Sequence, residues 1–595
     1  MTADDVQGRF HVLGMPRKSI ATILSKWKTR EIFLILLASF VGALAAGAVM
    51  SMSWAAQVAH LIMFGVPLDV RLSANASVPI ISALVFPTAG GVALTLLERF
   101  GRGHRVPSAA DPVEANALRG GRLSLSGSMM MSGQTLLSNG CGASVGLEAG
   151  YVQIGAGIAS WVGRHIGLRR NDLRLMVGCG AAGAIGAAFN APLAGALYAC
   201  ELIIGAYSVR SAGPVLAASV SAALLTGQVG PHPYSLHVQV GEVRNALAQA
   251  IALSGVALIT GVTGIGLMRA VAFLERAFKS LVPALVRPAA GGLFVGVLAI
   301  YTPQVLAAGH GAVVLDLGLA LTAKTLLILI FLKLIACTVS LASGFRGGLF
   351  FASLFLGVLI GKLYAVLLST SLDPLGLGID PVVSAVTGMA GLATAVIGAP
   401  LTMVLLVLEM TKSFDAAAAA LPACLVTSIF VRASFGHSFA TWRLHLKGQT
   451  IKSADDIGWL RDLTVGSIMA RDFTAVSSEM TISECRRIFL LGTHQALFIT
   501  DSGGTYRGVV LPIDLFADRQ REKASKSVCV LARYANLALR ANWNVKAAMR
   551  LFEEADAEVL AVTDAGGSLL GFLTEKSARR RYIEELDNAM PDPMP

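Results

Sequence analysis

The chain has 595 residues, of which 54% are hydrophobic and only 14% are charged. That charged share is well below the roughly 25% usual in soluble globular domains, and the mean hydropathy is +0.67, which excludes an ordinary soluble protein. The net charge of +11 indicates anchoring at a cytoplasmic membrane face more than binding of nucleic acid.

A first membrane span is predicted at residues 32–50, which carry no charge and are long enough to cross the hydrocarbon core at about 1.5 Å per residue. Residues 1–31 lack the pattern of a cleaved signal. They are predicted to form a cytoplasmic N-terminal segment of a protein in the cell (inner) membrane, because basic side chains precede the span: Arg17, Lys18, Lys26, Lys28 and Arg30. Further apolar tracts predict a polytopic all-α domain over residues 32–445: 78–97, 175–202, 212–226, 245–268, 289–300, 317–341, 348–367 and 382–431.

One carboxylate, Glu148, lies in the glycine-rich stretch GASVGLEAGYVQIG at residues 142–155. It is the only charged side chain between Arg122 and Arg164. A charge inside the membrane is costly, so an ionisable residue kept there is a functional-site hypothesis by default. The alternative is that Glu148 only caps a helix N-terminus in a hydrated loop, where acidic residues are favoured.

The membrane domain contains an internal repeat. FNAPLAGALYACEL (189–202) matches IGAPLTMVLLVLEM (397–410) in register, with Pro192 and Pro400 opening the two segments and a glutamate following nine positions later in each. Two halves with matching helix breaks indicate inverted-topology repeats, whose transport site lies near the midplane where the broken helices meet. We place the two repeats at about residues 32–228 and 245–445.

Glycine-rich segments also correspond between the halves, at residues 145–150 and 347–352. Each is predicted to begin a helix inside the membrane, exposing unsatisfied N–H groups and a partial positive charge. Such a helix start binds an anion without any basic side chain, and glycine lets the backbone approach the ion closely. Glu148 would compete with a transported anion for these dipoles and would swing away when protonated. The sequence therefore predicts a gate that mimics the substrate.

A soluble tail follows the membrane domain, because charge rises and long apolar tracts stop after about residue 444. We predict a linker at 446–462 and a tail at 463–595. Within the tail, DSGGTYRGVV (501–510) recurs as DAGGSLLGFL (564–573), each after a short hydrophobic run and before a charged helical stretch. This pattern predicts strand, turn, strand and helix in two α/β units, at about 463–520 and 526–588.

Four motifs resemble those of the CLC family of chloride channels and transporters. GLEAGYVQIGAGI is similar to the family's gating motif, GREGPxVQIG; AAFNAPLAGALYACE to its central helix; GGLFF to its GxFxP motif; and IGAPLTMVLLVLEMT to its late APLT…LEMT segment. The resemblance runs from about residue 30 to 445 in the family's order, and the paired tail units resemble tandem CBS domains. It implies a homodimer with a separate pore in each subunit that transports chloride or a related anion.

The resemblance also implies which residues form the site. Glu148 would be the external gate, and backbone amides of Leu349 and Phe350 would hold the anion. The complete implied anion-binding set is Gly146, Leu147, Ala149, Gly150, Gly348, Leu349, Phe350, Ser108 and Ala440.

Several positions depart from the family pattern. The serine of the family's first motif, GSGIP, falls on Ala109 or Ser108, and its coordinating tyrosine falls on Ala440. The proline of GxFxP is Ala352, and Arg346 stands just before the paired glycines. With hydroxyl ligands lost, the choice among chloride, nitrate and bicarbonate stays open. Arg346 either raises the local anion concentration or extends to water.

Proton-coupled members of the family carry a second glutamate directly after the one that matches Glu201, and here that position is Leu202. An apolar side chain cannot relay a proton, so the resemblance favours passive anion conduction over an anion/proton antiporter, which is the alternative. Glu201 is expected to support helix packing, since Glu409 repeats it.

The CBS resemblance implies a candidate site for an adenosine nucleotide. The family's ribose-binding aspartate falls on Asp514 in the first unit and on Ser577 in the second, while the preceding threonine is Leu511 in the first and Thr574 in the second. Each unit keeps one element of the pattern. A purely structural, dimer-forming tail is the competing interpretation.

Two other classes of protein, an intramembrane hydrolase and a membrane-anchored sensor, fit parts of the sequence. GASVG at residues 142–146 fits the G-x-S-x-G pattern of a serine nucleophile, and Ser144 with His310 would then suggest an intramembrane hydrolase. That pattern needs a strand–turn–helix context, so we expect no enzyme. A membrane-anchored CBS sensor would not need duplicated broken helices. No metal-ligand cluster, phosphate loop or nucleic-acid motif is present, so we expect no metal, required cofactor or nucleic-acid partner.

Overall fold

This computed structural model describes residues 27–104, 106–107, 109–229, 236, 246–372, 380–446, 464–488, 496–516 and 525–588. It divides into two compact units, Met1–Asp456 and Ile457–Pro595, which are considered separately. Most of the predicted N-terminal segment 1–31 and of the predicted linker 446–462 lies outside the described residues.

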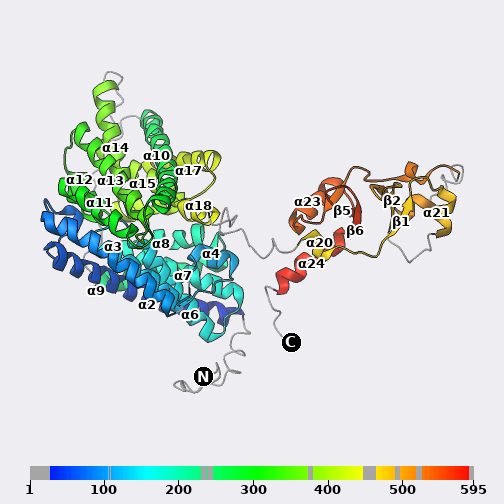
Figure 1. Cartoon of the computed structure of the whole chain (residues 1–595), viewed down its shortest axis with the longest axis horizontal. Helices are drawn as coiled ribbons and strands as arrows, with labels where there is room; N and C mark the ends of the chain where they lie inside the picture. Colours follow the sequence, from blue (N-terminus) through cyan, green and yellow to red (C-terminus); the bar gives the residue numbers. More distant parts are fainter. Residues whose placement is uncertain are drawn as a thin grey trace, which may run out of the picture. The chain divides into compact units, whose positions relative to one another are not determined.

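The first unit is all-helical (Figure 1). Among its described residues, eight helices are long and apolar enough to cross a membrane. The elements of its first half are α2 (Trp27–Phe64), η1 (Leu72–Ala74), α3 (Ile80–Gly103), α4 (Pro112–Leu118), α5 (Leu125–Gly140), α6 (Glu148–Ile166), α7 (Arg170–Phe189), α8 (Pro192–Tyr198), the π-helix η2 (Ala199–Ile204) and α9 (Val209–Val229). Those of its second half are α10 (Ala246–Leu281), α11 (Arg287–Tyr301), η3 (Pro303–Val305), α12 (His310–Gly318), α13 (Ala323–Ser343), α14 (Phe350–Leu372), α15 (Pro381–Ile397), α16 (Pro400–Thr411), α17 (Phe414–Ser434) and α18 (Phe439–Leu446).

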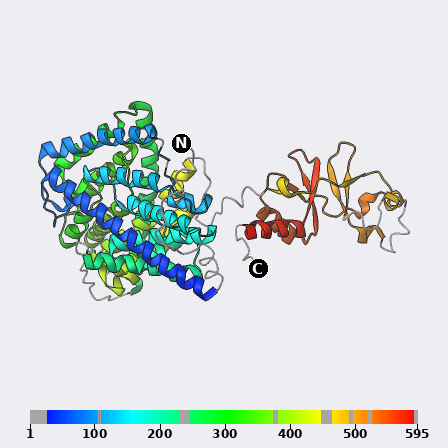
Figure 2. The same cartoon turned by 90° about the horizontal axis from the view of Figure 1, so that it is seen from below.

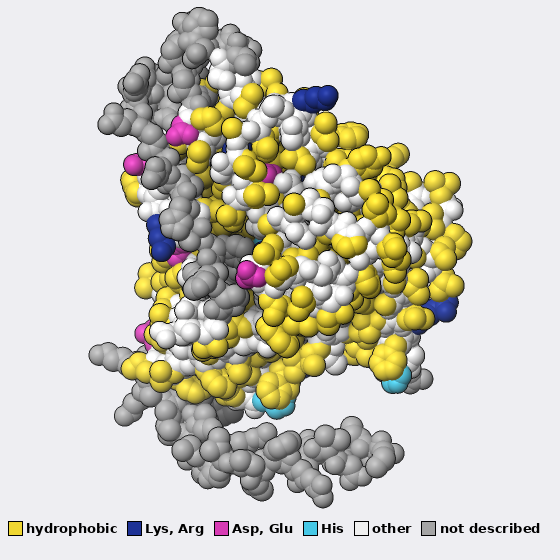
Figure 3. All heavy atoms as spheres, turned by 90° about the vertical axis from the view of Figure 1, so that its left-hand side faces the viewer, with side chains coloured by type: hydrophobic (Ala, Val, Ile, Leu, Met, Phe, Trp, Pro, Cys, Tyr) yellow, Lys and Arg dark blue, Asp and Glu magenta, His cyan; other side chains and the backbone are white. Residues whose placement is uncertain are grey.

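The surface of this unit is that of a multi-pass membrane protein. Hydrophobic side chains cover much of the face seen in Figure 3, where charged side chains are sparse. Exposed apolar residues lie along several long helices, such as Leu36 and Phe40 on α2, Ile81 on α3 and Phe331 on α13. In water these side chains would destabilise the fold, whereas lipid tails solvate them.

The two halves repeat the same helix break. In the first, α7 ends at Asn190, which is left-handed (φ 49°), and α8 begins at Pro192. In the second, α15 ends at the left-handed Gly398 (φ 84°), and α16 begins at Pro400. A left-handed residue ends a helix and a proline favours the first position of the next. The predicted all-α fold with repeated broken helices is therefore confirmed.

The helices that follow the glycine-rich loops also pack alike within the all-helical unit, which Figure 2 shows from a second side. α6 crosses α7, and α14 crosses α15. A Cβ on Gly155 would collide with the carbonyl of Gly180, and one on Gly357 with the carbonyl of Gly388. Small residues let membrane helices approach closely enough for backbone contact. Gly155 lies seven residues after Glu148, where α6 begins, and Gly357 lies seven residues after Phe350, where α14 begins. The repeat therefore extends to tertiary packing.

The second unit contains two three-stranded sheets, ordered β1-β2-β3 and β4-β5-β6. In each, the first pair is parallel and the second antiparallel. The predicted strand–turn–strand–helix repeat is confirmed. The elements are α20 (Val465–Ile468), β1 (Thr474–Ser477), α21 (Ile482–Ile488), β2 (Leu497–Thr500), β3 (Tyr506–Val510), α22 (Pro512–Phe516), η6 (Val528–Leu531), β4 (Ala538–Arg540), α23 (Val545–Ala555), β5 (Val559–Thr563), β6 (Leu569–Thr574) and α24 (Glu575–Asn588).

Candidate functional site

The two glycine-rich loops meet at the centre of the membrane unit. The Gly146 N–H donates to the Gly348 carbonyl at 2.9 Å, and the Gly348 N–H donates to the Gly146 carbonyl at 3.1 Å. A Cβ on Gly347 would press against Val145, so glycine permits this close pairing. The predicted convergence of the two helix starts is therefore present.

Because of this pairing, the backbone amides of the two loops fall into two groups: those bonded between the loops and those still available for an anion. Those of Gly146 and Gly348 hold the two loops to each other, so they frame the site. The first turns of α6 and α14 carry the N–H groups that lack intrahelical acceptors and bear the partial positive charge. Among the predicted anion ligands in these turns or just before them, Leu147, Gly150, Leu349 and Phe350 are buried and Ala149 is half-buried.

Glu148 is the first residue of α6 and is 2% exposed. Its carboxylate folds back over Gly146, where a Cβ would collide with Oε2. Oε1 lies 3.3 Å from Nε2 of His310. The only carboxylate of this stretch thus occupies the point where α6 and α14 begin, which is the arrangement a gate requires.

His310 contacts Glu148, and the sequence analysis had placed it only in the hydrolase alternative. Its imidazole packs on the ring of Phe351 with centroids 3.7 Å apart. Ser144, the nucleophile of that alternative, has other contacts: its Oγ lies 3.3 Å from Sγ of Cys337 and its N–H donates to Oγ of Ser340. The glycines on both sides of His310 were a weak sequence signal for a helix start.

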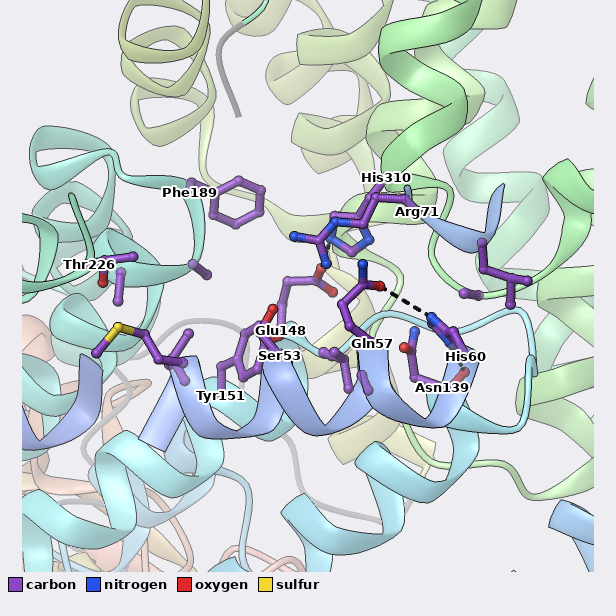
Figure 4. A pocket seen from close by; sticks show the side chains of 18 of the residues that line it. Ser53, Gln57, His60, Arg71, Asn139, Glu148, Tyr151, Phe189, Thr226 and His310 are labelled. Atoms are coloured by element: carbon purple, nitrogen blue, oxygen red, sulfur yellow. Dashed lines mark hydrogen bonds and ion pairs between the residues drawn. The ribbon is translucent and has the colours of Figure 1, made fainter. Parts of the chain in front are cut away.

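A cavity of about 70 Å³ opens beside Glu148. In Figure 4, Arg71 and His310 lie next to the carboxylate, and Gln57 lies near them with its amide oxygen toward His60. Gln57 donates to the carbonyls of Leu68 and Val70, holding the segment that carries Arg71. Arg71 belongs to no motif, so the sequence alone did not point to it. Other polar residues lining the cavity are Ser53, His60, Ser73, Asn139, Tyr151, Asn190 and Thr226.

Aromatic side chains gather beside the start of α14. The ring of Phe350 lies 5.0 Å from Phe189 and 6.1 Å from Tyr198, and Phe189 stacks on Phe351 at 5.9 Å. Phe189 also lines the cavity at Glu148. The anion loops are therefore bordered by an apolar wall contributed by both repeats.

Each of the two repeated glutamates, Glu201 and Glu409, caps the start of a helix in the opposite repeat. The carboxylate of Glu201 accepts from the N–H groups of Leu401 and Thr402 and from the Thr402 hydroxyl. The carboxylate of Glu409 accepts from the N–H groups of Leu193 and Ala194, each at 2.8 Å. Each glutamate thus caps the broken helix of the other repeat, as expected of residues that support packing.

Leu202 lies within η2, a π-helix, and packs against the core cluster that contains Phe350. π-Helical turns occur frequently at functional sites. The position at which the resemblance would place a proton-relaying glutamate is thus filled by a half-buried apolar side chain.

Three positions at which the sequence departs from the family pattern differ in their surroundings. Ser108 lies outside the described residues. Ala440, the second residue of α18, is half-buried, whereas its neighbour Phe439 is buried in the same cluster as Leu349. Arg346 forms a 2.9 Å ion pair with Glu98, and its side chain is 41% exposed.

In the tail, both candidate nucleotide ligands already have partners. Asp514 forms a 2.6 Å ion pair with Arg533. The hydroxyl of Thr574 accepts from the N–H of Ser577 at 3.1 Å, capping α24. A nucleotide at Asp514 would have to share that carboxylate with the guanidinium of Arg533.

Together, inverted repeats with broken helices, paired glycine loops and an intramembrane glutamate define a CLC-type anion-transport protein. The sequence profile described as "Voltage gated chloride channel" matches residues 89–432, and that of the CBS domain matches residues 465–518. The chain belongs to the voltage-gated chloride channel (CLC) family, whose common function is anion transport, and it carries a C-terminal CBS domain.

Curated relatives agree with this assignment. The chain is 31% identical over 423 residues to the "Voltage-gated ClC-type chloride channel ClcB" of Escherichia coli, covering 69% of this chain and 98% of the relative. It is 33% identical over 364 residues to the "Putative chloride channel protein ClcB-like" of Ralstonia nicotianae, covering 59% and 82%.

Solved structures share the fold. A slow cyanobacterial Cl⁻/H⁺ antiporter superimposes with a TM-score of 0.56 at 22% identity, covering 73% of this chain and 98% of its own. A eukaryotic CLC transporter superimposes with a TM-score of 0.58 at 18% identity, covering 91% and 97%. At these identities the likeness concerns the fold alone.

Proposed function

We propose that the chain conducts anions passively through one pore in each subunit, with Glu148 as the gate. The observation that carries this proposal is the buried Glu148 carboxylate at the paired glycine loops, where α6 and α14 both begin. A carboxylate there lies in the field of the same helix starts that would attract a passing anion.

Opening would follow neutralisation or displacement of that carboxylate. A protonated Glu148 loses its attraction to the two helix starts and leaves the space to an anion held by backbone N–H groups of Leu349 and Phe350. Flux through the open site would be bounded by the aromatic wall at Phe189 and Phe350. No step requires a metal or a cofactor.

Passive conduction is favoured over anion/proton antiport by two residues. Leu202 cannot carry a proton, and the adjacent Glu201 is held by three donors at the start of α16. The Glu201 carboxylate is therefore committed to the start of α16, which supports a packing role for it. The antiporter is the alternative that the experiment below separates.

The proposed substrate is chloride, with nitrate and bicarbonate as further candidates. The site has an alanine, Ala440, at the position assigned to the family's tyrosine, and the neighbouring Phe439 also lacks a hydroxyl. Backbone N–H groups then carry most of the recognition. Such a site discriminates between anions by size and charge more than by directed hydroxyl contacts.

The assembly is proposed to be a homodimer in the inner membrane, with the N-terminus and the tail in the cytoplasm. An apolar pocket of about 450 Å³ opens between α8 and α9 and is lined by Leu193, Leu197, Tyr207, Leu216 and Leu405 among others. A second copy covering this face would bury it. In the tail, Asp514 and Thr574 are proposed to contact an adenosine nucleotide.

The test is anion efflux from proteoliposomes with pH recorded at the same time. Wild-type flux that moves no protons against a gradient, together with altered gating in Glu148→Gln, supports the proposal. Uphill proton movement driven by a chloride gradient, and lost in Glu148→Gln, would establish the antiporter. If the wild-type protein shows no anion flux at all, the sensor interpretation replaces both.

A further inference from the structure

His310 is held in place from three sides. It begins α12, and the Ser73 hydroxyl accepts from the N–H groups of Gly311 and Ala312 at 3.0 and 3.3 Å, capping that helix. The buried Lys333 donates to the carbonyls of Gln304, Val305 and Ala307, so it fixes the segment just before His310. With its ring against Phe351, the imidazole has little freedom to leave Glu148.

The charged and titratable groups that face His310 come from four elements. Glu148 at the start of α6 lies within 3.3 Å of Nε2. Arg71, just before η1, His60 on α2 and Lys333 on α13 also interact with it electrostatically. Asp316 is itself near the far end of α12, where Lys362 on α14 donates to the carbonyls of Leu317 and Leu319. The surroundings of the gate are therefore cationic on balance.

The basic groups around Glu148 come from outside the gating motif, which has no basic residue next to the glutamate in this chain. The family's gating motif has an arginine directly before the glutamate, and in this chain that residue is Leu147, which is buried. Arg71 and His310 approach the same carboxylate from distant segments (Figure 4). The chain thus surrounds its gate with basic side chains that do not come from the gating loop.

We propose that His310 is the positioning residue of the gate: its Nε2 holds the Glu148 carboxylate in the closed place and so sets the external pH at which the gate opens. This inference rests on the proposed function, because it acts through Glu148. It assigns to His310 a role in pH-dependent gating, with Arg71 adding to the field that favours a charged carboxylate.

The sign of the effect follows from the contact. A neutral imidazole with its proton on Nε2 donates to the carboxylate, and a protonated one does so more strongly. In both states His310 favours the charged, closed Glu148. Removing His310 should weaken the closed position of Glu148, so the midpoint of activation should move to higher external pH.

The experiment compares anion efflux at a series of external pH values for wild type, His310→Gln and His310→Ala. Glutamine keeps a donor but cannot become charged, so the midpoints should rise in the order wild type, His310→Gln, His310→Ala. His165→Gln is the matched control, since His165 is exposed at the end of α6 and bonds only its own helix at the Trp161 carbonyl. Monodispersity and melting temperature are recorded for each variant.

A double variant separates positioning from mere structural support. In the Glu148→Gln background, His310→Ala should leave the pH profile unchanged, because the group through which it acts is gone. Superimposable wild-type and His310→Ala profiles, or an equal shift with Glu148→Gln present, would overturn the inference. Neither outcome touches the proposed function, which fails only if the wild-type protein conducts no anion or if Glu148→Gln leaves gating unchanged.

Discussion

The loop before α6 and the loop before α14 follow one backbone plan but carry different side chains at their helix starts. Each places a glycine in the reciprocal pair Gly146–Gly348. The first loop is followed by Glu148, and the second by Phe350. The shared backbone can attract an anion from both repeats, whereas only the first repeat supplies a group that competes with it.

If Glu148 is the gate, as we propose, the difference makes anion binding and gating separable in this fold. Main-chain dipoles are fixed by the two helix starts and do not depend on side-chain charge. In the proposed function, gating depends on one carboxylate, which has Gly146 beneath it and His310 beside it. Substitutions can therefore test whether the repeats are equivalent in packing and unequal in function.

The largest effect is expected where the repeats are equivalent. Gly357→Val and Gly155→Val each force a side chain into the backbone of the crossing helix, with an overpacking cost at or above the upper end of about 1–3 kcal/mol. Both variants should yield little folded protein by size-exclusion chromatography. Gly266→Val, where a Cβ meets open space on α10, is the control. A folded Gly357→Val variant with wild-type melting temperature would disprove the close crossing.

A large functional effect is expected at Gly146, where the repeats diverge. The Cβ of Gly146→Ala would occupy the place of Glu148 Oε2, so the carboxylate could no longer fold back. A steric penalty of about 1–3 kcal/mol on the closed state shifts the open population by roughly 5- to 150-fold. Anion efflux at neutral pH should rise toward that of Glu148→Gln.

The control for that measurement is Gly133→Ala on α5, where a Cβ meets nothing within contact distance. It should retain wild-type efflux at every pH. If Gly146→Ala also kept the wild-type pH profile, the carboxylate would not close the site from the position described.

A moderate and symmetric effect is expected at the exchanged caps. Glu201→Gln and Glu409→Gln each remove the charge from a carboxylate that accepts from a helix N-terminus, which costs up to about 2 kcal/mol in a partly buried site. Melting temperatures should fall similarly for both, and anion flux without proton movement should persist. A loss of proton transport in Glu201→Gln alone would contradict the packing role and favour antiport.

The sequence predicted those features that depend on local chemistry. Glycine and proline mark helix breaks wherever they occur, so the paired loops at Gly146 and Gly348 and the starts at Pro192 and Pro400 could be found without coordinates. The CBS hairpins followed from their repeated Gly-Gly turns for the same reason.

The partners of the gate could not be found in this way. Arg71 and His310 reach Glu148 only through tertiary packing, and neither lies in a periodic pattern. The burial of α18 also depends on docking, since Ala440, the position matched to the family's tyrosine, is half-buried whereas its neighbour Phe439 is buried. Side-chain constellations assembled from distant segments leave no local signal.

The smallest effect is expected in the tail, where the comparison of repeats continues. Asp501 accepts from the N–H groups of Gly503 and Thr505 and pairs with Arg507, whereas Asp564 in the second unit accepts from the Ser568 N–H. The Thr505 amide, with Arg507 and the Gly503 amide adding to it, holds the pKa of Asp501 below its usual value.

The contribution of Asp501 is therefore present above the unfolded aspartate pKa of about 3.9 and is lost as pH falls through the lower folded pKa. Asp501→Asn should slightly speed hydrogen exchange in the β2–β3 hairpin of the full chain at pH 7 and should match wild type in strong acid. Asp564→Asn should act on β5–β6 instead. Equal exchange at pH 7 in wild type and Asp501→Asn would mean that the Gly-Gly turns alone hold both hairpins, and the two units would then be equivalent where the two membrane repeats are not.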